Sequence, residues 1–459
     1  MRLAAAEKLS GLLRVRMRAG PFRIYFLGLT LHLFYLLVLY ISPAAKYNLE
    51  LPEGGSSDNL WKGRDVMTYV EPARNALEHG VFGRDGEPDH HRTIGYPFFL
   101  ALMMRLCGPR WLLCTHLAQA ALFALLYPIL ASMGFMLFGR RFRLAPLLLF
   151  LLLAGTYWSK VPIIMTDCFF TLLFTLGLYF GLRSVRGRGI LDFVLYLLFV
   201  GAAAQVRPTL ILYPFLHLAL YPAAAAQAAR IDRAERLTRP AVMKRLAIAF
   251  VLLLPLCNAP TLRNALHHGL YKPADAFEKG LFDALAQDVL IRGGRADLYR
   301  QMQSDVEAAD DLKQRLALKR AYALEVYRDD PLGTAEVLVR NAVRILGNSH
   351  LLSVAHFWGR HWRDFDSEKH MPLRGSIVLA AVNTVSYLVY AALYLGFILS
   401  LLRCVRSGSF WSAFAVLLLT AYLIVPTFML RSDARVRLPV EGLVLLFAVP
   451  VLPGLKEGR

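Results

Sequence analysis

Residues 190–222 have the sequence ILDFVLYLLFVGAAAQVRPTLILYPFLHLALYP. This largely apolar stretch indicates how the chain folds. As one helix it would be about 50 Å long, whereas the hydrocarbon core of a bilayer is about 30 Å thick. Gln205, Arg207 and Pro208 interrupt it near the middle, and proline inside a helix kinks or breaks it. The stretch therefore predicts a membrane hairpin with two short arms.

Apolar segments recur along the whole chain. Its 459 residues are 56% hydrophobic, above the roughly 45–50% that is typical of soluble domains. The candidate spans are 24–42, 111–138, 145–160, 168–182, 190–205, 208–222, 246–258, 376–402, 409–430 and 438–453. The run 95–108 is too short to cross and is predicted to lie at the interface. We expect an all-α polytopic membrane protein with about ten transmembrane helices.

The net charge of +19 first suggests nucleic acid, but the position of the charges excludes it as a partner. With the N-terminus inside, the cytoplasmic pieces hold 22 Lys and Arg against 4 Asp and Glu. These pieces are 1–23, 139–144, 183–189, 223–245, 403–408 and 454–459. Positive charge on cytoplasmic loops orients membrane proteins. The bias predicts a multi-pass protein of the cytoplasmic (inner) membrane with both termini in the cytoplasm.

Three parts follow from this topology. Residues 1–258 form a transmembrane module with a first outer loop at 43–110, residues 259–375 a second outer loop, and residues 376–459 the last spans. Within the second loop, 280–345 is charged and helical in pattern, which predicts a small helical subdomain. The five cysteines are odd in number and lie in or beside apolar runs, so we expect no disulfide framework.

Arginines gather at the predicted outer ends of the spans. The cluster RSDARVR (431–437) violates the charge bias, and Arg207 and Arg263 lie at the same membrane face. A guanidinium binds phosphate through two parallel hydrogen bonds, which suggests a lipid-phosphate site with Arg435 as a member. Alternatively, each arginine extends to lipid headgroups, and Arg437 pairs with Glu441 four residues on.

Two acidic residues are candidates for chemistry. Asp65 could act as a base or could cap a helix that starts near Val66, and Asp58 is its rival. Asp167 lies at the outer end of a predicted span, where ionisable residues are costly and often functional. Its alternative is a cap of the 168–182 helix, paired with Lys160.

Four places in the sequence carry short motifs. The first is GRDVMTYVEPARNALEHGVF (63–82) with HRTIGYPFFLALMMRLCG (91–108), and the second is VPIIMTDCFF (161–170) with QVRPTLILYP (205–214). The third and fourth are NAPTLRNALHHG (258–269) and RVRLPVEGLVLL (435–446). In this order the four places resemble the GT-C membrane glycosyltransferases, and the closest branch contains protein O-mannosyltransferases and lipid A aminoarabinose transferases. The chain departs from the family pattern at Val66, Val436 and Glu441.

The resemblance implies transfer of a sugar from a polyprenyl-phosphate donor to an acceptor on the outer face of the membrane. Asp65 would be the general base and Asp167 a second catalytic carboxylate; a divalent metal could be shared between them. The lipid phosphate would be bound by Arg207, Arg263, Arg435 and Arg437. Tyr69 and Tyr96 would pack or line the sugar site.

Other classes of protein remain open. A transporter or lipid flippase would carry out no bond chemistry, but such proteins often have duplicated halves, and no repeat is evident here. An oligosaccharide ligase or an O-acyltransferase would also use outer arginines and a histidine. The histidine pairs His90–His91 and His267–His268 lack a third ligand at helical spacing, so we expect solvated loop residues and no metal site there.

Overall fold

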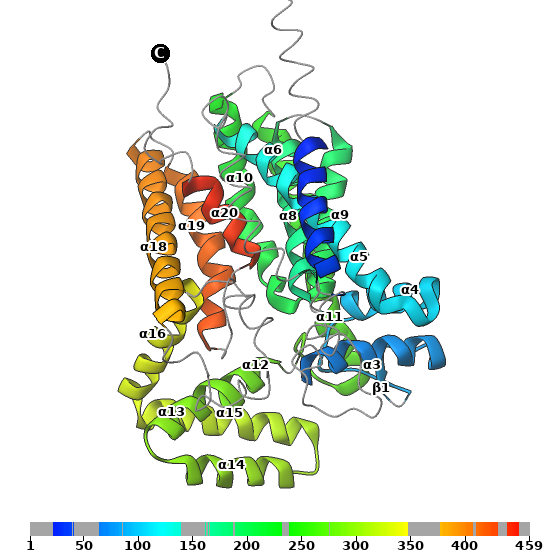
Figure 1. Ribbon diagram of the computed structural model, residues 1–459, viewed down its shortest axis with the longest axis vertical. Helices are drawn as coiled ribbons and strands as arrows, with labels where there is room; N and C mark the ends of the chain where they lie inside the picture. The colour runs from blue at the N-terminus through cyan, green and yellow to red at the C-terminus, as the bar shows by residue number, and fades with distance from the viewer. Residues whose placement is uncertain are drawn as a thin grey trace, which may run out of the picture.

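The computed structural model describes residues 22–38, 40, 64–84, 86–138, 161, 164, 166–186, 189–231, 238–274, 276–347, 377–406, 410–429 and 438–448. Within these ranges the regular secondary structure is helical apart from one antiparallel hairpin, β1 (Gly83–Arg84) and β2 (Glu87–Pro88). Long helices form a bundle, and a lobe of shorter helices is attached at one end (Figure 1). The all-α prediction is confirmed.

The helices of the bundle and of its loops are Phe22–Val38, α3 (Arg64–His79), α4 (Gly95–Cys107), α5 (Trp111–Ala124), α6 (Leu126–Phe138), α8 (Thr166–Val185), α9 (Ile190–Val206), α10 (Tyr213–Ile231), α11 (Arg239–His268), α18 (Ile377–Arg406), α19 (Phe410–Ile424) and α20 (Leu438–Ala448). The lobe consists of α12 (Ala276–Lys279), the π-helix η6 (Gly280–Ala286), α13 (Gln287–Arg292), α14 (Ala296–Ala308), α15 (Leu312–Asp329) and α16 (Pro331–Gly347).

Four stretches are long and apolar enough to cross a membrane: Gly95–Phe138, Thr166–Val185, Arg239–His268 and Tyr387–Arg406. Shorter apolar helices are Phe22–Val38, Ile190–Val206, Ala413–Thr427 and Pro439–Ala448. By length and composition these helices fit a membrane protein. The predicted span 145–160 lies outside the described residues.

The interruption predicted in 190–222 is present. Arg207 has extended backbone angles, and a short 3-10 turn, Pro208–Leu210, separates α9 from α10. The conformation of Arg207 has a steric cause, because the residue before a proline is pushed out of the helical region. The break therefore follows from Pro208 itself.

Helices α8 and α9 pack closely as an antiparallel pair. A Cβ on Gly177 would lie 2.7 Å from a methyl carbon of Val200, and one on Gly181 would lie 3.1 Å from the ring of Tyr196. Gly189, with φ of 107°, precedes α9 in a conformation that L side chains rarely adopt. The small residues on α8 thus allow its backbone to approach α9. This close contact fixes which residues of the two helices face each other at each end of the pair.

The span predicted at 246–258 is too short. Helix α11 covers Arg239–His268, starting after the N-cap Thr238 and ending at Gly269, whose φ is 61°. It extends beyond the predicted span on both sides and contains Pro255 and Pro260. A helix tolerates proline within membrane-embedded segments when neighbouring groups satisfy the freed carbonyls. The side chain of Gln205 donates to the carbonyl of Leu256 at 2.8 Å, which ties α9 to this region of α11.

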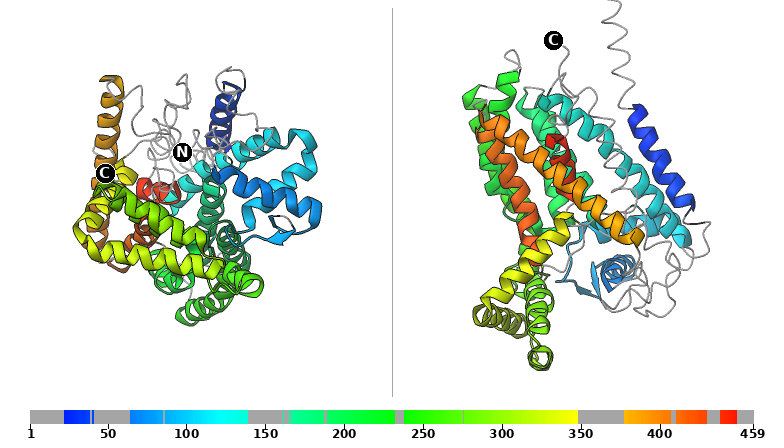
Figure 2. Two further views of the ribbon diagram at one scale, coloured as in Figure 1. Left: turned by 90° about the horizontal axis from the view of Figure 1, so that it is seen from below. Right: turned by 60° about the vertical axis from the view of Figure 1, so that its left-hand side comes forward.

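The lobe has a core of its own. Phe282 and Leu290 are fully buried there among other apolar side chains from η6, α13, α14, α15 and α16. Tyr327 donates to the carbonyl of Leu281 at 2.5 Å, which links α15 to the π-helix. Figure 2 shows the lobe extending away from the long helices. We call the end of the bundle that carries α3, α4 and this lobe the lobe end.

The expectation about cysteines was wrong. Cys107, the last residue of α4, and Cys114, in the first turn of α5, form a disulfide with 6.6 Å between their Cα atoms. A 3-10 turn, Gly108–Arg110, brings the two helix ends together. Sequence spacing alone did not reveal this corner. Cys168, Cys257 and Cys404 are free thiols.

Candidate functional site

The α8–α9 pair brings Asp167 and Arg207 together at the lobe end. Asp167 lies in the first turn of α8, and Arg207 directly follows α9. Their atoms Oδ1 and Nη2 are 2.9 Å apart, and the side chains are 4% and 20% exposed. The guanidinium also lies 5.6 Å from the centre of the Phe170 ring. The partner of Asp167 is thus Arg207; Lys160, the partner we had considered, lies outside the described residues.

This ion pair is close but incompletely hydrogen-bonded. Oδ1 of Asp167 is buried and has no aligned hydrogen bond among the residues that the structure describes. A guanidinium carries five N–H donors, so one contact leaves Arg207 with donors for a second anion. The carboxylate therefore holds Arg207 in place at the end of two apolar helices, and N–H groups of Arg207 remain to bind an anion.

The first-loop segment packs directly against this pair of helices. Thr93 donates through its hydroxyl to the carbonyl of Val206 at 2.8 Å, one residue before Arg207. A Cβ on Gly95 would lie 2.6 Å from the carbonyl oxygen of Gln205, so only glycine fits at the start of α4. The N-terminus of α4 is consequently fixed against the end of α9.

The end of α11 joins the same group of segments. Arg263 donates from Nη2 to the carbonyl of Arg92 at 2.9 Å and to Oδ1 of Asn264 at 2.8 Å. Asn264 in turn donates to the carbonyls of His90, Lys272 and Pro273 at 3.1 to 3.3 Å. In this structure Arg263 contacts the loop and the neighbouring amide, where the sequence had suggested phosphate.

Asn264 is the residue that sequence reasoning missed. It is 1% exposed and connects the end of α11 to two loops. The signal was present in the segment NAPTLRNALHHG, because a polar residue in the last turn of an apolar helix needs a partner. The identity of those partners depended on the loop path and could not be read from the sequence.

Tyr69 and Tyr96 are both buried and contact each other edge to face, with ring centres 5.4 Å apart. The hydroxyl of Tyr96 donates to Gln119 at 2.7 Å, and Gln119 donates to the carbonyl of Val161 at 2.6 Å. The guanidinium of Arg92 lies 4.7 Å from the centre of the Tyr69 ring. The two tyrosines thus pack α3 against α4 and join both to the segment that precedes α8.

Asp65 is the second residue of α3, which begins at Arg64. The side chain of Asp65 lies outside the described residues. Val66, Tyr69 and Val70 are buried on one face of the helix and belong to the main core. The backbone position of Asp65 is therefore set by a packed helix in the first loop.

Several other predicted residues lie outside the described part of the chain: Asp58, Arg431, Arg435 and Arg437. Glu441, which we had paired with Arg437, accepts a hydrogen bond from the hydroxyl of Tyr390 at 2.6 Å. That contact joins α20 to α18.

The two histidine pairs contact each other through His90 and His268. The rings of His90 and His268 are 5.3 Å apart between centres, and Nδ1 of His91 lies 3.0 Å from Nζ of Lys279. Among the residues that the structure describes, no group of three or more His, Cys, Asp or Glu side chains is arranged to hold a metal ion.

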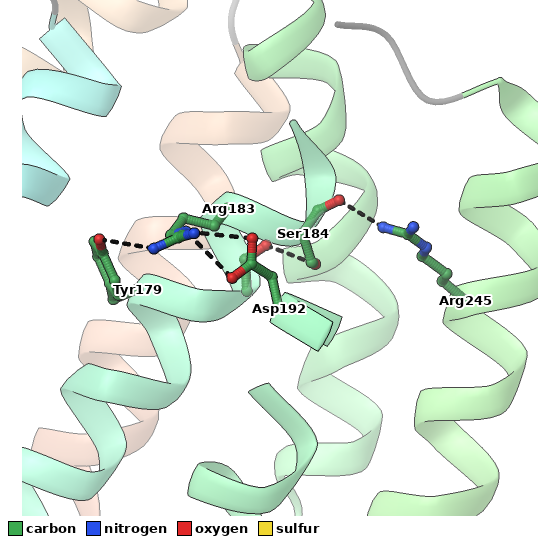
Figure 3. A network of polar contacts seen from close by, with 6 residues as sticks. Tyr179, Arg183, Ser184, Asp192 and Arg245 are labelled. Carbon is green, nitrogen blue, oxygen red and sulfur yellow. Dashed lines mark hydrogen bonds and ion pairs between the residues drawn. The ribbon is translucent and has the colours of Figure 1, made fainter. Parts of the chain in front are cut away.

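The opposite end of the same helices carries a matching ion pair (Figure 3). Arg183 Nε lies 3.2 Å from both carboxylate oxygens of Asp192, and Arg183 Nη1 donates to the hydroxyl of Tyr179 at 3.3 Å. Arg245 on α11 donates to the carbonyl of Ser184 at 2.6 Å. The partner of Asp192 is thus Arg183, which lies in the last turn of α8, across the α8–α9 turn.

Comparisons of the chain with protein-family models, with curated proteins and with solved structures found no match. The glycosyltransferase resemblance therefore rests on the sequence motifs.

Proposed function

We propose that the protein is a membrane glycosyltransferase of the GT-C type, with a polyprenyl-phosphate sugar as donor. One observation supports this proposal most. Motif segments far apart in the sequence, 91–108, 161–170, 205–214 and 258–269, pack together at the lobe end around Asp167 and Arg207. Their contacts at one end of the bundle support a single shared site.

In the proposed topology about ten helices cross the cytoplasmic membrane and the lobe end faces outward. The charge bias of the loops supports this orientation. A donor lipid in the outer leaflet would then present its phosphate at the level of Arg207, where the apolar helices end.

The chemistry needs one base and a cation. An acceptor hydroxyl attacks the anomeric carbon of the sugar while the bond from that carbon to the phosphate oxygen breaks. Asp65 takes the hydroxyl proton, and the lipid phosphate leaves as an anion. Fixed cations stabilise the negative charge that develops on the phosphate. Direct displacement inverts the configuration at the anomeric carbon.

Arg207 is the proposed phosphate ligand, and Asp167 is its positioning residue. The carboxylate holds the guanidinium in one orientation, and the remaining N–H donors face the anion. Arg263 is bound to the carbonyl of Arg92 and to Asn264, so we assign it to positioning the first loop. Arg435 and Arg437 stay candidate phosphate ligands on sequence grounds.

The test compares two arginines of the same helix pair. Arg207→Ala should raise the donor concentration needed for half-maximal transfer by about 10–100-fold, because a charge-assisted contact to phosphate is lost. Lysine at 207 should restore part of this, since it offers charge without the planar fork. Arg183→Ala is the control, because it breaks the corresponding pair with Asp192 at the opposite end.

Equal donor dependence in the Arg207→Ala and Arg183→Ala proteins would refute the phosphate assignment. Movement of the intact donor lipid across the membrane, without cleavage of the sugar–phosphate bond, would favour a flippase.

A further inference from the structure

A cavity of about 150 Å³ lies among the long helices, away from Asp167 and Arg207. Residues near the far ends of three helices line it, namely Phe138 of α6, Leu182 of α8 and Cys404 of α18. Its wall is otherwise formed by apolar side chains of α10, α19 and α20, among them Leu220, Val416 and Leu443. The cavity is thus separate from the proposed donor site.

One corner of this cavity is polar. His217 of α10 lines it and is 1% exposed. The hydroxyl oxygen of Tyr196 lies 2.5 Å from Nδ1 of His217 and 3.5 Å from the hydroxyl of Tyr213. Nε2 of His217 is buried and has no hydrogen-bond partner among the described residues. Burying a ring nitrogen without a hydrogen-bond partner costs free energy. The Nε2 atom of His217 therefore suggests a ligand that forms a hydrogen bond with it.

The chemistry of this nitrogen restricts the ligand. The single proton of the Tyr196 hydroxyl goes to either His217 or Tyr213, and this decides whether Nε2 is a donor or an acceptor. A ligand hydroxyl can donate and accept, so it satisfies either case. Water is a poor occupant, because a buried water needs two to four polar partners and the wall is mostly apolar.

We propose that this cavity binds the end of an aliphatic chain that carries a hydroxyl group, with the hydroxyl bonded to Nε2 of His217. A cavity of about 150 Å³ holds a molecule the size of benzene, which corresponds to about six carbon atoms. The long apolar helices around it give a lipid-derived alcohol direct access from the bilayer. The inference stands on this cavity and does not depend on the proposed transferase activity.

The experiment is photolabelling of the full-length protein in lipid with a diazirine-bearing alkanol of about six carbons. Adducts should map to the cavity wall, and excess 1-hexanol should suppress them more strongly than hexane. His217→Phe should lower cavity labelling about tenfold, the equivalent of about 1.4 kcal/mol for one hydrogen bond. Leu198→Phe is the control, because Leu198 is 59% exposed on α9 and does not line the cavity.

A second variant keeps the test decisive if His217→Phe does not fold. Ala415→Phe on α19 places a ring in the cavity and leaves His217 intact, so it should also abolish cavity labelling. Unchanged labelling in both folded variants, or adducts confined to lipid-facing residues such as Leu198, would overturn the proposal. Equal competition by hexane and 1-hexanol would overturn the role of His217.

Discussion

Asp167, at the start of α8, and Arg207, directly after α9, form a partly buried ion pair with 2.9 Å between Oδ1 and Nη2. Arg183 and Asp192 form a second pair at the other end of the same two helices. Each end of the α8–α9 pair thus carries one arginine and one aspartate. The two pairs differ in their surroundings, because only the first lies among the segments whose motifs resemble those of GT-C glycosyltransferases.

The Asp167–Arg207 pair predicts a specific pattern of stability. Asp167→Asn leaves the guanidinium without its counter-charge in a largely apolar site, which should destabilise the protein by about 3 kcal/mol. The double variant Asp167→Asn with Arg207→Gln removes both charges and should recover most of that loss. Thermal unfolding of the purified proteins in detergent measures both. A double variant less stable than Asp167→Asn alone would contradict the pairing.

The disulfide predicts how many thiols react. Maleimide labelling of the denatured, unreduced protein should modify only the three free cysteines, Cys168, Cys257 and Cys404. Reduction should expose Cys107 and Cys114 as well. Mass spectrometry of the intact chain counts the adducts.

This count also bears on orientation, because disulfides persist outside the cytosol and are rare within it. Protein taken from cells with all five cysteines reactive before reduction would place the α4–α5 corner on the reducing side, contrary to the proposed topology.

The charge bias predicts the orientation of two segments. A reporter inserted within 223–245 should behave as cytoplasmic, and one inserted near Gly293 in the lobe should behave as external. A paired phosphatase and fluorescent-protein fusion at each site gives the readout. An external 223–245 would reverse the α10–α11 connection and place Asp167 and Arg207 on the cytoplasmic side.

The sequence predicted those features of the fold that depend on residues next to each other in the chain. The break at Arg207 follows from Pro208 and from the length of the apolar stretch. The length of α11 did not follow, because the helix extends at both ends beyond the apolar stretch 246–258 from which the span was predicted. The disulfide of Cys107 with Cys114 depended on the corner between two helices.

The candidate site was predictable only as a set of residues. Asp167 and Arg207 are charged residues at the ends of apolar stretches, which marked both as candidates. The resemblance to one family suggested that they belong to one site. Their direct pairing depended on the register between α8 and α9, which Gly177 and Gly181 help to set through close contact. The links made by Asn264 and Arg263 depended on the path of the first loop.

The proposed transfer reaction is tested most directly by the release of polyprenyl phosphate from polyprenyl-phosphate sugars, compared between the wild-type and Asp65→Asn proteins. The measurement uses purified protein returned to lipid with an acceptor-containing membrane extract. Asn keeps the size of the side chain and removes the base, so release should fall by about 10²–10⁴-fold while insertion and thermal stability stay unchanged. Equal release by both proteins would contradict the assignment of Asp65, and no release by the wild type from any such donor would contradict the transferase itself.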